Sequence, residues 1–397
     1  MATLFSEAEA RDRILAAVGA VPVREEPCEL WAAGDRVAAA DFHARIPLPG
    51  FDNSSVDGYA VRSEEVTGAS RFQVQGTQAA GLDTAQVLTP GHALRIFTGA
   101  PLPDGADAVL MQEDCTRDGD VIVAQAHLQP GENVRRCGDD LARGQRMIAA
   151  GTVLRAPQLG LLATQGYAQI SVWRRPTVSI IATGSELRPA DEALRPGEIH
   201  ESNRVMLADL VRRAGGLPRV LPIIPDEPSV HREAFAQAQG ADVIVVAGGV
   251  SVGDHDLVKP TLRELGASLD LWRVALRPGK PFLFGKLGPS LVFGLPGNPV
   301  SAFVTFLRFV RPALLRLAGC TAVDDGAIPA VTDETLRNDG DRPHYVRVRC
   351  QNGRVRLSGR QESHALFALS QANALVRLEP GQVAQPGETV DVFRFSP

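Results

Sequence analysis

The spacing of apolar residues changes along the chain, and each spacing predicts a different kind of element. Near the start, Ile14, Leu15 and Val18 recur at helical intervals, and the segment Ser6-Glu7-Ala8-Glu9 before them has the composition of a capping box. We therefore expect an amphipathic helix in this region. A loop rich in Pro and Gly follows around residues 46–50.

Residues 50 to about 150 have a different pattern, in which short alternating or apolar runs are separated by Gly, Pro and Asp. Such a pattern is typical of strands and turns, and it predicts a small β-rich lobe. The expected strands cover 72–75, 93–97, 108–112 and 120–124. A short helix is expected over 156–164 and a strand over 168–173.

From residue 176 onward, continuous apolar runs alternate with helical patterns, which predicts a parallel sheet with helices on both faces. Strands are expected at 177–182, 219–224, 241–247 and 290–295. Helices are expected at 205–214, 228–239 and 257–266, and a long one from Pro299, with Asn298 placed to cap it. The tail returns to short strands, at 345–350, 354–358, 374–378 and 389–393.

These patterns predict a multidomain protein of the α/β plus β class. Its central domain, residues 176–325, would be a three-layer α/β/α domain with a mostly parallel sheet. Residues 1–50 and 140–175 would form an N-terminal helical and linker domain, with the β-rich lobe, 51–139, inserted in it. Residues 328–397 would form a small C-terminal β-barrel or sandwich.

Composition and charge argue against several classes of function. The 397 residues carry a net charge of −5, which is not the basic footprint of a nucleic-acid-binding protein. The apolar runs are far shorter than a membrane span, and the first residues do not resemble a signal peptide. Five dispersed cysteines without a CxxC pair fit reduced thiols. We therefore expect a cytoplasmic protein that binds neither nucleic acid nor a membrane.

Glycines and carboxylates follow several of the predicted α/β strands. The loops begin at Thr183-Gly184-Ser185-Glu186, Pro225-Asp226, Gly248-Gly249 and Pro296-Gly297, and the third of them runs on to Asp256. A parallel sheet brings such loops to one edge, where ligands bind. Glycines let backbone N–H groups approach an anion, and carboxylates suit Mg²⁺ that also bridges phosphates. The first interpretation is therefore a phosphate-bearing ligand with Mg²⁺ held by Glu186, Asp226 and Asp256.

Each of these residues also has a structural interpretation, and the sequence leaves both open. Asp226 and Asp256 precede helices and would serve equally well as N-caps, whereas Glu186 would serve as a solvated loop residue. The cations of residues 277–281, Arg-Pro-Gly-Lys-Pro, suit either an oxyanion or a solvated turn. The polar loops at 52–60 and 96–101 could not be identified as catalytic from physical chemistry alone.

Six segments together resemble one family. They are DNSSVDGYAVR (52–62), IFTGAPLPDGADAV (96–109), IATGSEL (181–187), GGVSVGDHD (248–256), RPGKP (277–281) and GLPGNPVSA (294–302). In this order they are similar to the molybdopterin molybdenumtransferases, bacterial molybdenum-insertion enzymes related to the E domain of gephyrin. The resemblance extends from about residue 5 to about residue 395. A single motif is modest, whereas six in the right order are highly specific.

The resemblance implies a reaction and an assembly. Such enzymes take adenylated molybdopterin, Mg²⁺ and molybdate, insert molybdenum at the dithiolene and release AMP. They are elongated homodimers, with a cleft between the α/β domain of one subunit and the β-rich lobe of the other. The implied partners are a molybdopterin adenylyltransferase, which supplies the substrate, and apo-molybdoenzymes or their chaperones, which take the product.

The resemblance also implies roles for single residues. The catalytic set would be Asp57, Thr98, Glu186, Asp226, Asp256 and Lys280, with the acids other than Asp57 as metal ligands. Lys280 and Arg347 would neutralise molybdate or phosphate charge. The remaining substrate contacts would come from Gly184, Ser185, Gly248, Gly249, Ser251, Gly253, Arg277, Pro296, Gly297 and Asn298.

Two departures from the family and two other functions complete the expectations. Arg277 stands where relatives often carry Lys, and Phe367 and Ala368 replace a frequent pair of serines. Arg277 would retain oxyanion binding with a different geometry, whereas the tail lacks the hydroxyls of that serine pair. The first alternative function is a molybdopterin adenylyltransferase, which resembles 176–325 alone. The second is a gephyrin-like scaffold.

Overall fold

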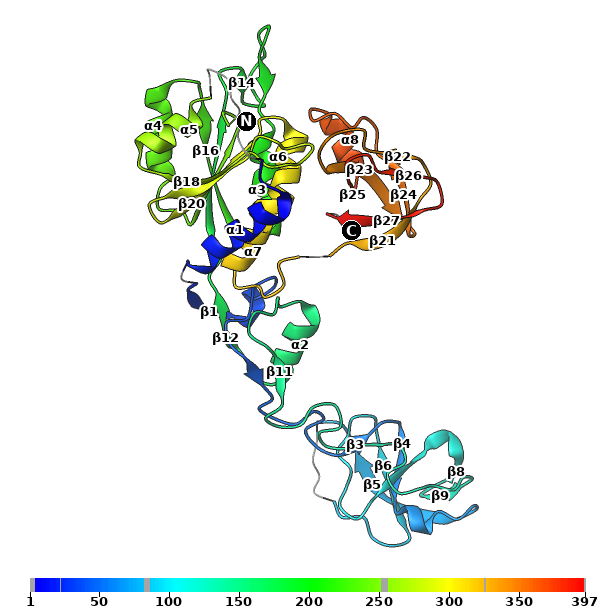
Figure 1. Cartoon of the computed structure of the whole chain (residues 1–397). Helices are drawn as coiled ribbons and strands as arrows, with labels where there is room; N and C mark the ends of the chain where they lie inside the picture. The colour runs from blue at the N-terminus through cyan, green and yellow to red at the C-terminus, as the bar shows by residue number, and fades with distance from the viewer. Residues whose placement is uncertain (1–3, 22, 82–85, 251–255, 325, 396–397) are drawn as a thin grey trace. The chain divides into compact units, whose positions relative to one another are not determined.

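Figure 1 shows the protein as a computed structural model that describes residues 4–21, 23–81, 86–250, 256–324 and 326–395. The chain divides into two compact units. The lobe unit consists of residues 40–150 and 157–168, and the main unit consists of 1–39, 151–156 and 169–397. Among the described residues, no helix is both long and apolar enough to cross a membrane.

The lobe unit is built on a six-stranded sheet, as its strand-and-turn pattern predicts. The strand order is β7-β4-β6-β5-β9-β8. The bounds are β4 Gly58–Val61, β5 Arg71–Gln78, β6 His92–Ile96, β7 Ala108–Met111, β8 Cys115–Asp118 and β9 Val121–Ala124. Tyr59, Phe72, Leu110 and Ile122 form the centre of its core. The predicted helix at 156–164 is present as α2, Ala156–Thr164.

The main unit contains a second six-stranded sheet, with the order β16-β13-β17-β20-β19-β18. The first four strands are parallel, and the last two are antiparallel to their neighbours. The bounds are β13 Thr177–Thr183, β16 Leu217–Ile224, β17 Val243–Ala247, β18 Ser268–Trp272, β19 Leu283–Leu287 and β20 Ser290–Leu295. The mostly parallel sheet is confirmed, but β18 and β19 were not predicted, because their short mixed sequences have no clear period.

Helices cover both faces of this sheet (Figure 1). Alternate residues of each central strand face opposite sides, so that Val243 and Val245 pack with α3 and α6 while Ile244 and Val246 pack with α4 and α5. The helices are α1 Glu7–Gly19, α3 Asn203–Arg213, α4 Pro228–Ala238, α5 Val258–Glu264, α6 Pro299–Thr305 and α7 Arg311–Leu317. The three-layer domain is therefore confirmed.

The ends of two helices test the capping predictions. Ser6 caps α1 with a complete capping box that includes Glu9, as predicted. The long helix expected from Pro299 is instead interrupted by a π-helical turn, η4 (Phe306–Val310), between α6 and α7. Pro312 has no N–H to donate to the carbonyl of Arg308, which accounts for the change of hydrogen-bond register at this point.

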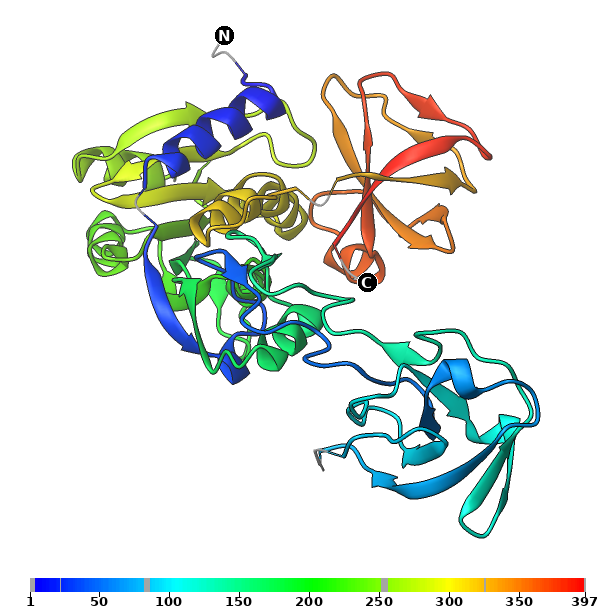
Figure 2. The ribbon, with the colours of Figure 1, turned by 90° about the horizontal axis from the view of Figure 1, so that it is seen from below.

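The tail forms a closed barrel with the order β21-β24-β23-β25-β27, visible in orange and red in Figure 2. The bounds are β21 Ile328–Thr332, β23 His344–Gln351, β24 Arg354–Leu357, β25 Ala374–Leu378 and β27 Thr389–Arg394, and the helix α8 covers Leu366–Gln371. Helix α1 is joined to the barrel through Glu7, whose carboxylate accepts hydrogen bonds from Tyr345 and Arg377 and from Arg308 of η4.

Short strands and turns complete the chain. The two-stranded pairs are β1 (Glu25–Glu29) with β12 (Gln169–Trp173), β2 (Phe42–His43) with β11 (Arg146–Ile148), β3 (Asn53–Ser54) with β10 (Val134–Arg135), β14 (Leu187–Arg188) with β15 (Ile199–His200), and β22 (Leu336–Arg337) with β26 (Val383–Ala384). Three 3-10 turns cover Leu30–Ala32, Ser63–Glu65 and Gln112–Asp114.

Candidate functional site

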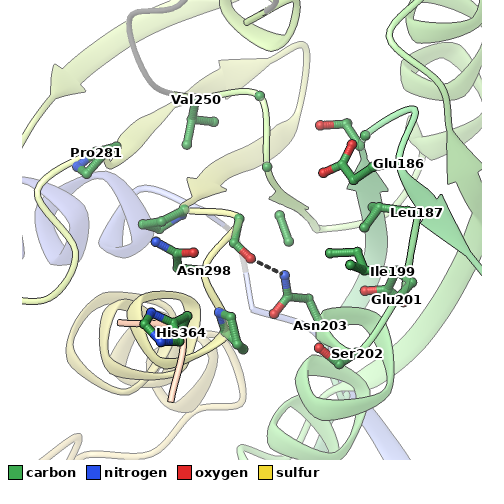
Figure 3. Close-up of a pocket in the computed structure, with 18 of the residues that line it drawn as sticks. Glu186, Leu187, Ile199, Glu201, Ser202, Asn203, Val250, Pro281, Asn298 and His364 are labelled. Carbon is green, nitrogen blue, oxygen red and sulfur yellow. Dashed lines mark hydrogen bonds between the residues drawn. The ribbon is translucent and has the colours of Figure 1, made fainter. Parts of the chain in front are cut away.

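A pocket of about 640 Å³ lies at the carboxyl ends of the parallel strands of the main unit (Figure 3). Strand-end loops supply most of its wall, as the topology of an open α/β sheet predicts. The predicted site residues that line it are Gly184, Glu186, Asp226, Gly248, Gly249, Asp256, Pro296, Gly297 and Asn298. Ser251 and Gly253 lie outside the described residues.

The three predicted metal ligands line this same pocket, and one of them, Asp226, does not cap the helix that follows it. The N-cap position of α4 is Glu227 rather than Asp226, and that of α5 is Leu257 rather than Asp256. Asp226 instead makes reciprocal hydrogen bonds with Ser185, whose N–H donates to Asp226 Oδ2 (3.2 Å) and whose Oγ accepts from the Asp226 N–H (2.9 Å). The structural interpretation of Asp226 as a cap was therefore wrong.

Two glycines bring bare backbone to the floor of the pocket. Gly248 and Gly249 both have positive φ angles, of 95° and 64°. A Cβ atom at Gly248 would lie 2.6 Å from the Thr183 carbonyl oxygen, so any side chain there would force the two loops apart. Glycine at this position is therefore required by the packing of the loop against β13.

Asn298 occupies the N-cap position of α6, but its side chain makes no cap hydrogen bond. Its Nδ2 donates instead to Ser363 Oγ (2.9 Å), and the N–H of Val300 donates to the Ser363 carbonyl (3.2 Å). These bonds hold the loop before α8 against the α/β domain. As a result, His364 and Leu366 of the tail also line the pocket.

The start of α3 supplies residues that the sequence analysis missed. Glu201 and Asn203 line the pocket, although less than a tenth of each residue is exposed. Both carboxylate oxygens of Glu201 accept from Arg204, Oε1 from the backbone N–H (2.9 Å) and Oε2 from Nε (2.8 Å). The available signal is the polar run Glu201-Ser202-Asn203 before the helix, but this run does not follow an apolar strand.

The predicted cations are not among the described residues that line the pocket. Arg277 and Lys280 are exposed, and only their neighbour Pro281 reaches the wall. Arg347 is fully buried in the barrel, where one of its terminal nitrogens donates to the carbonyls of Arg360 (2.5 Å) and Glu362 (3.2 Å). Burial lowers the pKa of the Arg347 guanidinium from its usual value.

A buried histidine accompanies Arg347. The ring nitrogens of His344 have no hydrogen-bond partner within the described structure, and only 4% of the residue is exposed. Burial, together with the charges of Arg277 and Arg347, lowers the pKa of His344 to about 4. At neutral pH this histidine is therefore uncharged.

In the lobe unit, the predicted residues Asp57 and Thr98 form one hydrogen-bonded group. Asp57 directly precedes β4 and Thr98 follows β6, and these strands are antiparallel neighbours that pair Gly58 with Ile96. The Thr98 N–H and hydroxyl both donate to Asp57 Oδ1, each at 2.8 Å. These bonds, first the backbone N–H and then the hydroxyl, lower the pKa of the Asp57 carboxyl. Both side chains are exposed and so available to a ligand.

The donor set of the pocket fits Mg²⁺ better than a metal held wholly by protein. Within the described ranges, no three His, Cys, Asp or Glu side chains are close enough together to hold a metal ion. However, Mg²⁺ is typically bound through one or two carboxylates, with waters and substrate phosphates completing the octahedron. Glu186, Asp226 and Asp256 offer such carboxylates in the lining of the pocket.

Comparison with known proteins covers nearly the whole chain. Residues 5–166 match the MoeA N-terminal region (domain I and II), 179–316 match a probable molybdopterin binding domain, and 329–395 match the MoeA C-terminal region (domain IV). The molybdopterin molybdenumtransferase of a Nostoc species is 36% identical over 90% of this chain and 85% of its own length. That of Haemophilus influenzae is 35% identical over 94% and 95%.

Solved structures agree with these matches. The crystal structure of the molybdopterin biosynthesis MoeA protein from Pyrococcus horikoshii OT3 has a TM-score of 0.86, with 28% identity over 99% of this chain and 100% of that one. The family matches lie in the lobe, the α/β domain and the tail, which is more than the α/β domain alone. The chain therefore belongs to the molybdopterin molybdenumtransferase family, a family of transferases in molybdenum-cofactor biosynthesis.

Proposed function

We propose that this protein inserts molybdenum from molybdate into adenylated molybdopterin, in a Mg²⁺-dependent reaction that releases AMP. Family membership supports the transfer of molybdenum to molybdopterin. The charge of the pocket supports the requirement for Mg²⁺ and is the observation that carries the proposal. We propose that the reaction takes place in the cytoplasm.

Four carboxylates line the pocket, those of Glu186, Glu201, Asp226 and Asp256, while neither Lys nor Arg occurs among the described lining residues. Such a wall repels a phosphate-bearing ligand unless a divalent cation lies between them. One or two of Glu186, Asp226 and Asp256 would hold Mg²⁺, with water and phosphate as its other ligands, because the carboxylate of Glu201 is already bound by Arg204. Bound Mg²⁺ would supply Lewis-acid stabilisation of charge on the phosphate.

The protein's own residues would position the ligand. The backbone at Gly184, Gly248, Gly249 and Gly297 lets the phosphate and pterin approach closely. The reciprocal bonds with Ser185 would fix Asp226 in one orientation. Lys280 and Arg277, which are exposed, would act on molybdate from outside the pocket described above, whereas the buried Arg347 would not contact it.

The remaining elements of the proposal concern assembly. A homodimer would bring Asp57 and Thr98 of one subunit to the pocket of the other. A molybdopterin adenylyltransferase would supply the adenylated substrate. Apo-molybdoenzymes or their chaperones would receive the finished cofactor.

The test is an assay with adenylated molybdopterin, molybdate and Mg²⁺, in which AMP release and protein-bound cofactor are measured together. We expect AMP release to require Mg²⁺, and Asp256→Asn to abolish it while leaving the oligomeric state unchanged. Full activity in Asp256→Asn would remove the metal assignment. Rapid adenylate formation from ATP and molybdopterin, without molybdate consumption, would favour the adenylyltransferase instead.

A further inference from the structure

Asn203, the first residue of α3, has an amide of defined orientation on the wall of the pocket. Its Nδ2 donates to the Gly297 carbonyl at 2.8 Å, the dashed line in Figure 3. Because that carbonyl accepts only, the other amide atom must be the oxygen, which can only accept. This oxygen is buried and has no hydrogen-bond partner in the described part of the chain.

Thr183, the last residue of β13, adds a second group of the same kind. Its hydroxyl is buried and also lacks a partner among the described residues. A Cβ atom at Gly248 or Gly249 would lie 3.0 or 2.9 Å from this hydroxyl oxygen. Only glycine therefore fits against this hydroxyl, and Thr183, Gly248 and Gly249 all line the pocket.

The surrounding structure holds Asn203 in place. The carboxylate of Glu201 is bound by Arg204, and Arg204 Nη1 also donates to the Leu221 carbonyl at 2.7 Å. These contacts fix the first turn of α3 to strand β16.

An unsatisfied buried acceptor costs about 1–3 kcal/mol, and its usual explanation is a water or a ligand that supplies the missing donor.

We propose that the Asn203 amide oxygen, with the Thr183 hydroxyl, accepts hydrogen bonds from N–H or O–H groups of the ligand and so selects its organic part. Orthomolybdate carries no proton at neutral pH and offers no donor to an amide oxygen. The pterin ring offers amino and ring N–H groups, and the nucleoside offers ribose hydroxyls and the adenine amino group. This inference rests on the proposed function. It adds that Asn203 and Thr183 together determine which organic group the pocket accepts.

The test is the affinity of the full-length protein for three separate probes, AMP, unsubstituted pterin and orthomolybdate, measured by calorimetry in the presence of Mg²⁺. We expect Asn203→Ala to weaken binding of AMP or of pterin about five- to tenfold, because one hydrogen bond is lost, and to leave orthomolybdate unaffected. Thr183→Val should weaken binding of the same probe. Val205→Ala is the matched control, since Val205 is an exposed residue two positions further along α3.

Ligand analogues identify the donor. If AMP is the affected probe, 2′-deoxy-AMP and the 6-deaminated analogue should bind the wild type more weakly than AMP. If pterin is the affected probe, lumazine, which lacks the 2-amino group, should bind the wild type more weakly than pterin. The analogue that removes the relevant donor should bind Asn203→Ala no more weakly than the parent probe.

Two results would overturn the inference. One is an unchanged affinity of Asn203→Ala for both organic probes, and the other is an equal loss for all three probes. A melting temperature near that of the wild type shows that α3 remains folded, and Thr183→Val provides a second variant if it does not. Because no turnover is measured, the outcome is independent of the AMP-release assay, so the proposed reaction and this pair can fail separately.

Discussion

Single hydrogen bonds set the charge state of several candidate residues. Asp57 shows this most directly, because one of its carboxylate oxygens receives both the N–H and the hydroxyl of Thr98. A carboxylate that accepts two hydrogen bonds in its charged form resists protonation. The pair therefore presents a fixed anion on the surface of the lobe, ready to orient a cation or a donor of the substrate.

Thr98→Val tests this arrangement, because valine keeps the shape and the backbone N–H but removes the hydroxyl. We expect the pKa of Asp57 to rise part of the way back to its ordinary value, since the larger contribution, from the backbone N–H, is retained. Carboxyl ¹³C chemical shifts followed through a pH titration would measure it. Thr98→Ser should restore the wild-type titration, and an unchanged midpoint in Thr98→Val would show that the hydroxyl has no influence.

His344 predicts a pH dependence of stability. Its pKa is about 4 in the folded protein and 6.5 without the environment of the fold, so between these values the unfolded chain binds more protons than the native one. Stability should therefore fall as the pH is lowered from about 6.5 to about 4, by at most about 1.4 kcal/mol per pH unit.

Thermal melting of wild type and His344→Gln at a series of pH values would measure this contribution. Glutamine has no proton to gain, so the variant should lose less stability on acidification than the wild type. Both proteins share the other titrating groups, which makes the difference between the two curves specific to His344. If the stability of the two proteins falls in parallel across this pH range, the lowered pKa of His344 is contradicted.

At the scale of elements, the period of the apolar residues predicted most helices and strands, because burial imposes that period directly. The strand-end rule also placed Glu186, Asp226 and Asp256 on one pocket, since parallel strands share a carboxyl edge. Asn203 was not predicted as a site residue, because it follows β15, a two-residue strand without an apolar run. The burial of Arg347 was unpredictable for a different reason, since five consecutive residues of β23 are buried where alternation was expected.

Contacts between elements could also not be predicted from the sequence, and the cluster around Glu7 is the clearest case. This carboxylate joins α1 to the barrel and to η4, with hydrogen bonds from Tyr345 (2.8 Å), Arg308 (2.6 Å) and Arg377 (3.2 Å). Its partners lie about 300 residues or more along the chain. Glu7 thus forms ion pairs with two arginines, and Arg377 also pairs with Glu379.

Glu7→Gln should therefore destabilise the main unit by about 3 kcal/mol, because it removes the acid partner of the largely buried Arg308 and leaves Arg377 paired with Glu379 alone. Tyr345→Phe is the matched comparison, since it removes one hydrogen bond and leaves both ion pairs, at a cost of about 1 kcal/mol. Differential scanning calorimetry would resolve the transition of the main unit from that of the lobe unit. Equal losses in the two variants would show that the ion pairs contribute nothing beyond the tyrosine bond.

At the scale of the whole molecule, the candidate residues are divided between the two compact units. Asp57 and Thr98 belong to the lobe unit, whereas Glu186, Asp226 and Asp256 belong to the main unit. Each group is locally well ordered by its own strands and loops. If both groups act on one substrate, the units must be brought together either within one chain or between the two subunits of the proposed homodimer.

Complementation between two inactive variants separates these arrangements. In a heterodimer of Asp57→Asn and Asp256→Asn subunits, a cleft shared between subunits would contain one site with both groups intact and one site with neither. Such heterodimers, isolated with two different affinity tags, should therefore release AMP at about half the wild-type rate per dimer, whereas each variant alone is inactive. A site formed within one chain would lack one of the two aspartates in every subunit, and the heterodimer would then be as inactive as its parents. Recovery of activity would thus establish a shared cleft, and its absence in a stable heterodimer would exclude one.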